Sequence, residues 1–329
     1  MIKFILRRIV YIIFVLILVS VFMFILFRSM PIDPVDLHLP PELAAGMRPH
    51  ELEMRRAEII ETMGLDQPNY IQYFYWLRAM LNGDFGISME TRMPVLDHIR
   101  SPMTNTVVIN ILNLIIVFAI TIPVGVYSAI KRGKLFDNVA LVASMTGISI
   151  PSFLFALLLI VVFAILFPIF PMFGMSSIHT PDEGTVAWYL DRLYHMALPL
   201  TAIVLMSLAG LIRFIRSAMI DSLNMDFVRT ARAKGLGEKV VIYSHAFRNA
   251  LIPIVTVMAG WFITIFGGSM VIELTFAWRG MGWIMLNALN IQDISVLMTV
   301  NLFYALIAFV GLLILDITYV IIDPRIRFE

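Results

Sequence analysis

The sequence contains no cysteine and few charged residues. Without cysteine, none of its 329 residues can form a disulfide bond or a thiolate metal site. Charged residues make up 14% of the chain and hydrophobic residues 60%, whereas about a quarter of an average soluble domain is charged. The hydrophobic residues gather in blocks long enough to cross a bilayer, which takes about 20 apolar residues. The composition therefore predicts a protein that crosses a membrane several times.

Sequence motifs for catalysis and nucleotide binding are also missing. The chain has no GxxxxGK[ST] phosphate loop, no HExxH zinc motif and no GxSxG nucleophile elbow. The six histidines show no close ligand spacing, and the net charge of +1 gives no general attraction to nucleic acid. We therefore expect no enzymatic activity, no cofactor or metal on this chain, and no nucleic-acid partner.

Charge-poor windows predict an all-α fold with six membrane-spanning helices, which places both ends of the chain on the same side. The spans are Ile9–Phe27, a helix within Ser101–Ile130, a helix in the window Asn138–Pro181 that ends near Phe167, Leu193–Ile212, a helix within Asn249–Ile272, and a helix that begins after Asp293 and reaches toward Ile322.

The distribution of lysine and arginine predicts the orientation of these spans. Segments 1–8, 131–137, 213–248 and 323–329 share one side and hold fifteen Lys and Arg, whereas the short opposite segments, 168–192 and 273–293, hold two. Segment 29–100 is set aside because long loops cross largely regardless of charge. We therefore expect both termini to be cytoplasmic.

Three regions follow from this topology. Residues 1–28 are the cytoplasmic N-terminus and the first span, 29–100 form an extracytoplasmic domain, and 101–329 form a five-helix core with a polar loop at 213–252. In the extracytoplasmic domain, the proline-rich start at residues 31–42 predicts extended chain. Residues 50–63 predict an amphipathic helix, and Tyr73 and Trp76 give the next stretch an apolar face.

The least apolar stretch of the core is a basic hairpin at residues 221–253. We expect Asn224 or Asp226 to cap a short helix that runs to Lys234 and stops at Gly235. A second helix should begin at Glu238 and end where Pro253 interrupts it. By composition, the hairpin is either an ordinary basic cytoplasmic loop or a docking surface for a soluble partner.

The residue order RTARAKGLGEKVVIYSHAFRNALIP in this hairpin resembles the EAA loop of ABC importer permeases of the dipeptide, oligopeptide and nickel family, of the first-permease type. Arg229, where the general motif has glutamate, begins the name-giving triplet, and Gly235 matches the motif's glycine. The resemblance implies a coupling helix that sits in a cleft of an ATP-hydrolysing subunit. The implied coupling residues are Asp226, Phe227, Arg229, Thr230, Ala231, Arg232, Ala233, Lys234, Gly235 and Leu236.

Further stretches resemble the same family, among them NGDFGIS at 82–88, GISIPSFLFALLLI at 147–160 and HMALPLTAIVL at 195–205. The stretch IELTFAWRGMGW resembles the family's outer loop, although Arg279 stands where proline is usual. The candidate gate or path residues are Asn105, Pro151, Glu273, Phe276 and Trp278. A helix-packing role for Asn105 and a purely structural kink at Pro151 remain the simpler alternatives.

The resemblance also implies an assembly in the inner or plasma membrane of a prokaryotic cell. The expected partners are a homologous second permease, two ABC ATPase subunits that bind ATP and Mg, an extracytoplasmic substrate-binding protein and membrane lipid. Short peptides are the implied cargo, and a nickel chelate or an oligosaccharide is the alternative. An ion-driven secondary carrier is the alternative from another class, and it would need ionisable residues at mid-span.

Asp316 is the one acid inside an apolar span, and we expect it to pair with Arg213 or Arg216.

Overall fold

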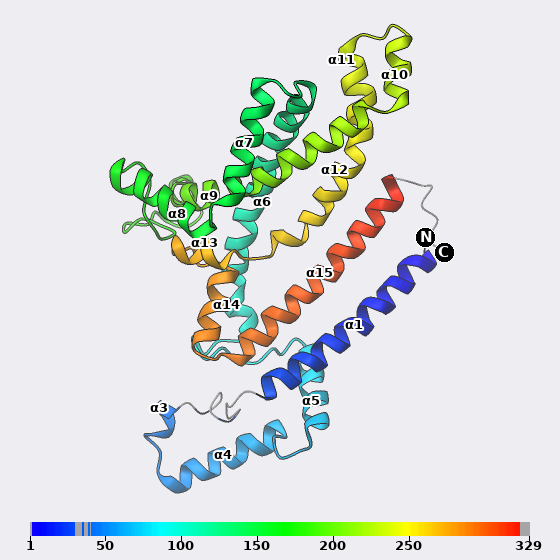
Figure 1. The fold of residues 1–329 in the computed structure, drawn as a ribbon. Helices are drawn as coiled ribbons and strands as arrows, with labels where there is room; N and C mark the ends of the chain where they lie inside the picture. Colours follow the sequence, from blue (N-terminus) through cyan, green and yellow to red (C-terminus); the bar gives the residue numbers. More distant parts are fainter. Residues whose placement is uncertain (1, 30–34, 36–38, 40, 323–329) are drawn as a thin grey trace. The chain divides into compact units, whose positions relative to one another are not determined.

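A computed structural model describes residues 2–29, 35, 39 and 41–322, and these are predominantly helical (Figure 1). Within these residues, five helices are long and apolar enough to cross a membrane, and a bent helix pair raises the number to six. The six predicted spans fall within these segments, so the all-α polytopic fold is confirmed. The segments are α1 (Ile2–Arg28), α6 (Val95–Ile130), the bent pair of α7 (Leu135–Ser149) with α8 (Ser152–Ile160) and the π-helix η1 (Val161–Leu166), α9 (Val186–Leu223), the stretch Glu238–Ile265 that contains α12 (Arg248–Trp261), and α15 (Ile294–Ile322).

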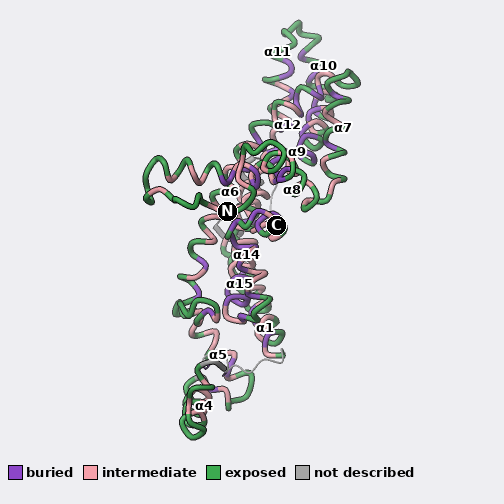
Figure 2. Tube along the Cα trace, turned by 90° about the vertical axis from the view of Figure 1, so that its left-hand side faces the viewer, coloured by how far each residue is buried: buried purple, intermediate pink, exposed green. Residues whose placement is uncertain are grey.

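The chain divides into two compact units. The first unit contains residues 1–101 and 284–309, and the second contains residues 102–283 and 310–329. Helix α1 belongs to the first unit, and few of its residues are buried (Figure 2). Such a surface suits a helix whose backbone hydrogen bonds are satisfied internally and whose side chains face lipid or another subunit.

The first unit also contains α3 (Pro41–Ala44), α4 (Pro49–Met63) and α5 (Asn69–Leu81). Helix α4 confirms the predicted amphipathic helix and ends at Gly64, whose φ of 62° is left-handed. The aromatic face of α5 packs against α1: the ring centroids of Phe24 and Tyr73 lie 5.6 Å apart, and Ser20 Oγ and Tyr73 Oη share a hydrogen bond of 2.8 Å. Most of the segment predicted to be extended, residues 31–42, lies outside the described residues, and the prediction is wrong for its described end, where Pro41 begins the short helix α3.

Asp293 organises the remaining part of the first unit. Its buried carboxylate accepts a hydrogen bond from the backbone N–H of Val296 (3.2 Å), which caps the N-terminus of α15. The same carboxylate accepts hydrogen bonds from Ser88 Oγ (2.9 Å) and from the backbone N–H of Met89 (2.6 Å). One acid therefore holds the loop before α6 against the start of α15.

The second unit is built around α9, against which α7, α8 and α12 pack. Helices α7 and α8 meet at Pro151 with a bend of 102°, so the kink predicted there is confirmed and is in fact a sharp break. Proline favours such a break because its ring prevents the preceding turn from continuing. Asn110 donates from Nδ2 to the carbonyl oxygens of Thr264, Ile265 and Gly267, at 3.0–3.1 Å. This amide joins α6 to the chain after α12.

Candidate functional site

The basic hairpin folds into α10 (Asp226–Ala233), α11 (Glu238–Val240), the π-helix η2 (Val241–Phe247) and the start of α12. Figure 1 shows α10 and α11 side by side, where α9 ends and the chain leads into α12. Gly235 follows α10 with a φ of 75°, so the predicted stop is confirmed. An L-amino acid with a side chain rarely adopts this conformation, which explains the glycine.

Two local predictions about this hairpin are wrong. Neither Asn224 nor Asp226 caps α10: the N-cap is Met225, Asn224 ends α9, and Asp226 is already the first helical residue. Pro253 does not end the second helix, because α12 continues to Trp261. The π-helical turn η2 already departs from α-helical pairing upstream of this proline, and such local adjustments satisfy the backbone groups that a proline leaves free.

One face of α10 is buried. Val228 and Ala231 lie in an apolar cluster with Ile215 and Met219 of α9. At the end of α9, Ser222 Oγ donates a buried hydrogen bond of 2.6 Å to the carbonyl oxygen of Ala246 in η2. Helix α10 is therefore held against the C-terminal part of α9 by apolar contacts. The neighbouring helix η2 is held to the same part of α9 by a hydrogen bond.

The other face of α10 is exposed. Nine of the ten predicted coupling residues lie on the exposed surface, and Ala231 alone is buried. The side chain of Arg229 is 76% exposed, and the side chains of Phe227 and Leu236 are exposed although they are apolar. Arg232 pairs with Glu238 at 2.7 Å, but an exposed pair of this kind contributes only about 0–1 kcal/mol. The exposed face is therefore a mixed basic and apolar surface suited to contact with another protein.

Sequence reasoning missed Asp137, the residue that fixes the C-terminal part of α9 to α7. Arg216 donates from Nε to Oδ1 of Asp137 (2.5 Å) and from Nη2 to Oδ2 (2.8 Å). The backbone N–H of Gly133 adds a third hydrogen bond to Oδ2, at 2.8 Å. Asp137 lies in the first turn of α7 and is only 1% exposed. Arg216 therefore has Asp137 as its bidentate partner, where we had expected Asp316.

The candidate path residue Glu273 lies at the centre of a polar cluster on the short helix α13 (Met270–Thr275), outside the candidate spans. Its carboxylate accepts hydrogen bonds from Thr106 Oγ1 (3.1 Å) and from the backbone N–H of Trp283 (2.8 Å). Thr106 Oγ1 in turn accepts a hydrogen bond from the backbone N–H of Met281 (2.8 Å). Burial raises the pKa of Glu273 above its ordinary value, although these hydrogen bonds oppose the shift in part.

The other candidate path residues lie around this cluster or at the break in the helix. Asn105 donates from Nδ2 to the carbonyl oxygen of Arg279 (2.8 Å), so its amide holds the 276–283 loop on α6. Phe276 is buried against α8, and Trp278 is buried beside Ile109 and Met196. Pro151 is exposed. The structure gives Asn105, Glu273, Phe276 and Trp278 structural contacts, and their place along a transport path stays a prediction.

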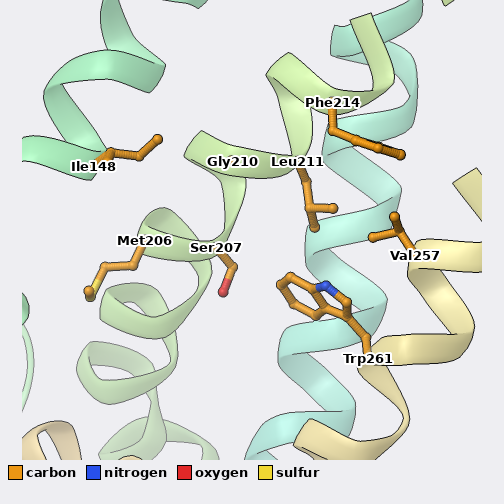
Figure 3. Close-up of a pocket in the computed structure, with 8 residues that line it drawn as sticks. All are labelled: Ile148, Met206, Ser207, Gly210, Leu211, Phe214, Val257 and Trp261. Atoms are coloured by element: carbon orange, nitrogen blue, oxygen red, sulfur yellow. The ribbon is translucent and has the colours of Figure 1, made fainter. Parts of the chain in front are cut away.

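A pocket of about 500 Å³ opens between α7, α9 and α12 (Figure 3). Its eight lining residues include no ionisable side chain, and its one hydroxyl, Ser207 Oγ, already donates to the carbonyl oxygen of Ile203 (2.8 Å). Figure 3 shows Trp261 of α12 pointing toward α9 across this pocket. The lining of this pocket is therefore largely apolar.

The helical spans and the exposed hairpin define a multi-pass membrane permease, and comparison with known proteins gives its family. Residues 121–328 match the family described as "Binding-protein-dependent transport system inner membrane component", and residues 1–124 match the corresponding N-terminal family. The chain belongs to this family of ABC importer permease components. It is therefore not an enzyme, because ATP hydrolysis belongs to a separate subunit.

Similar proteins match over the full length of the chain. It is 35% identical over 329 residues to the oligopeptide transport system permease protein AppB of Bacillus subtilis, with all of both chains covered. It is 33% identical to the dipeptide transport system permease protein DppB of Escherichia coli K12, and 32% identical to the glutathione transport system permease protein GsiC of Salmonella choleraesuis, again with all of both chains covered. These matches favour an ABC importer over an ion-driven carrier.

Proposed function

We propose that this chain is a permease subunit that imports short peptides across the inner or plasma membrane of a prokaryotic cell, with both termini in the cytoplasm. The names of the similar permeases support the cargo, since oligopeptides, dipeptides and glutathione are all peptides. A nickel chelate or an oligosaccharide is the alternative cargo. Ligand binding by the cognate extracytoplasmic binding protein would distinguish the three, and binding of a nickel chelate or an oligosaccharide in place of peptides would contradict the peptide assignment.

The observation that carries the mechanism is the division of α10 into a buried face and an exposed face. The exposed face is the surface that an ABC ATPase subunit would hold in its cleft. The buried face transfers movement to α9, because Val228 and Ala231 lie in the same cluster as Ile215 and Met219. ATP and Mg would bind to the two ATPase subunits, and closure of these subunits would displace α10. The spans then alternate between inward-open and outward-open arrangements.

Two further partners complete the proposed assembly. A homologous second permease would supply the other half of the path, and an extracytoplasmic binding protein would deliver the cargo. The apolar surfaces of the spans would contact this second permease and membrane lipid.

The proposal is tested by truncating the two exposed apolar side chains of the hairpin together, as Phe227→Ala with Leu236→Ala. Buried interface anchors often cost more than about 2 kcal/mol when truncated, so we expect recovery of the ATPase subunits with the purified permease to fall at least about tenfold. Peptide uptake should fall in parallel. The matched control is Phe173→Ala with Ile178→Ala, which removes two exposed side chains of similar kind from segment 168–192. Normal ATPase recovery and uptake in the hairpin variant would contradict the proposal.

A further inference from the structure

The Asp137–Arg216 pair links two helices at the base of the second unit. We propose that this pair is the joint through which displacement of α10 reaches α7, and through α7 the bent α7–α8 pair. The inference rests on the proposed function, in which α10 receives the movement from an ATPase subunit. It assigns Asp137 and Arg216 as positioning residues that need not contact cargo.

The geometry of the pair suits the transfer of movement. Two parallel hydrogen bonds, of 2.5 and 2.8 Å, fix the direction of the guanidinium as well as its distance from the carboxylate. The N–H of Gly133 holds the same carboxylate from the turn before α7. The Asp137 side chain is only 1% exposed, and that of Arg216 is 19% exposed, so water has little access to the carboxylate. The contact therefore resists both sliding and rotation of α7 against α9.

On one side, the pair is continuous with α10. Arg216 directly follows Ile215, which is fully buried in the cluster that holds Val228 and Ala231 of α10. The contact between α6 and α9 is also close here, since a Cβ added at Gly125 would lie 2.8 Å from Ile215. A displacement of α10 should therefore move this part of α9, with Arg216 on it, as one body.

On the other side, α7 has few other polar attachments. In the described part of the chain, the Asp137–Arg216 pair is the side-chain hydrogen bond that connects α7 to another helix, and α7 otherwise packs on α9 through apolar contacts. The far end of α7 is the 102° break at Pro151. Beyond it, α8 packs with Ile272 and Phe276. Helix α7 thus packs along α9, carries the hydrogen-bonded pair in its first turn and ends at a break in the backbone.

Stability alone is a weak explanation for a buried ion pair. Desolvation offsets much of the attraction between buried charges, and apolar side chains of similar shape often stabilise a protein as well. Loss of one partner has a larger effect, because it leaves the other charge buried without compensation. What distinguishes the pair is that its two parallel hydrogen bonds fix the orientation of α7 relative to α9. Its loss should therefore lower the amount of peptide transported per ATP, and not only the stability of the fold.

The test uses the complete importer, with its ATPase and binding-protein partners, in proteoliposomes. Asp137→Asn keeps the size of the side chain but removes its charge. We expect the ATPase subunits to remain bound and ATP hydrolysis to continue, while peptide transported per ATP falls about tenfold, within the range of about 5–150-fold typical of coupling between sites. The control is the same substitution at an exposed acid of segment 168–192, Asp182→Asn, which should transport normally.

A second variant and a distance measurement keep the test decisive if Asp137→Asn folds poorly. Arg216→Lys retains the charge but loses the planar bidentate contact, so it should give an intermediate ratio of transport to hydrolysis. The natural chain has no cysteine, so spin labels placed at two introduced cysteines, Val142→Cys on α7 and Ser217→Cys on α9, report directly on these two helices. Their distance distribution should stay narrow with and without ATP in the otherwise natural chain and broaden in Arg216→Lys.

The outcomes separate the joint from the function on which it rests. If the natural chain does not bind the ATPase subunits, the proposed function fails. If it binds them, but Asp137→Asn or Arg216→Lys transports normally for each ATP and leaves the distance distribution narrow, the joint alone is overturned. A loss of hydrolysis and transport in equal proportion would also overturn it, because the coupling ratio would then be unchanged.

Discussion

At the scale of single residues, Glu273 is a carboxyl group that the fold keeps out of water. Thr106 and backbone N–H groups contact its two oxygens, and a Cβ added at Gly280 would lie 2.6 Å from Oε1. A side chain at position 280 would therefore displace the carboxylate. Close packing against Glu273 therefore explains Gly280 and Gly282.

The raised pKa of Glu273 predicts a pH-dependent stability. The folded chain retains this proton at pH values where the unfolded chain, with a pKa near 4.5, has released it. The stabilisation by the proton is therefore complete below about pH 4.5 and is lost as the pH rises through the raised pKa. Thermal denaturation in detergent at a series of pH values above about 4.5 should show the natural chain losing stability with rising pH relative to Glu273→Gln, which is permanently neutral.

The direction and the control of this effect are defined. As the pH rises, we expect the Tm of the natural chain to fall relative to that of Glu273→Gln. Glu183→Gln makes the same substitution at an exposed position and should leave the pH dependence of the natural chain unchanged. If Glu273→Gln and the natural chain follow parallel curves, Glu273 does not retain its proton in the folded chain.

Single residues also show which parts of the site the sequence predicts. The exposed coupling residues and Gly235 follow from a contiguous motif, so their positions in the chain are enough to place them on one short helix. Asp137 and Arg216 lie 79 residues apart and meet only because α7 folds back along α9. No pattern in the sequence near Asp137 or Arg216 predicts that these two residues pair. From the sequence alone, Asp316 is an equally reasonable partner for Arg216.

At the scale of helices, hydrophobic length predicts the spans well because the thickness of the bilayer requires it. The ends of helices are less predictable. Asn224 and Asp226 are both good capping residues, yet the N-cap of α10 is Met225, which lies between them. Pro253 would end an isolated helix, but buried neighbours such as Ala250 and Ile254 hold α12 together through it. Tertiary contacts therefore override the local preference at both places.

The packing of α6 on α9 gives a prediction at this scale. A Cβ at Gly125 would lie 2.8 Å from the side chain of Ile215, so Gly125→Ala should separate the two helices and destabilise the chain by about 1–3 kcal/mol. Gly210→Ala is the matched control, because a Cβ there meets nothing within 4 Å and alanine favours a helix by about 1 kcal/mol. Thermal denaturation should lower the Tm of the first variant only. Equal Tm values would contradict the close contact between α6 and α9.

At the scale of the whole molecule, the account joins three surfaces. The spans provide apolar faces, and the exposed face of α10 is the proposed contact for the energy-supplying subunit. The buried face of α10 packs on α9, which carries Arg216 of the Asp137–Arg216 pair. Hydropathy and motif resemblance predict the first two surfaces. The third depends on which helices pack together, and apolar side chains in a membrane carry little sequence information about their neighbours.

The most direct measurement is site-specific cross-linking from the exposed face of α10 in the assembled importer. Because the natural chain has no cysteine, Arg229→Cys gives a single attachment point for a photoreactive probe, at a side chain that is 76% exposed. Ile178→Cys, at a residue that is 99% exposed, places the same probe on the segment expected outside the cell. The account predicts that the probe at position 229 cross-links to an ABC ATPase subunit and that the probe at position 178 does not. A probe at position 229 that reaches no ATPase subunit, or that reacts only from the extracytoplasmic side, would contradict it.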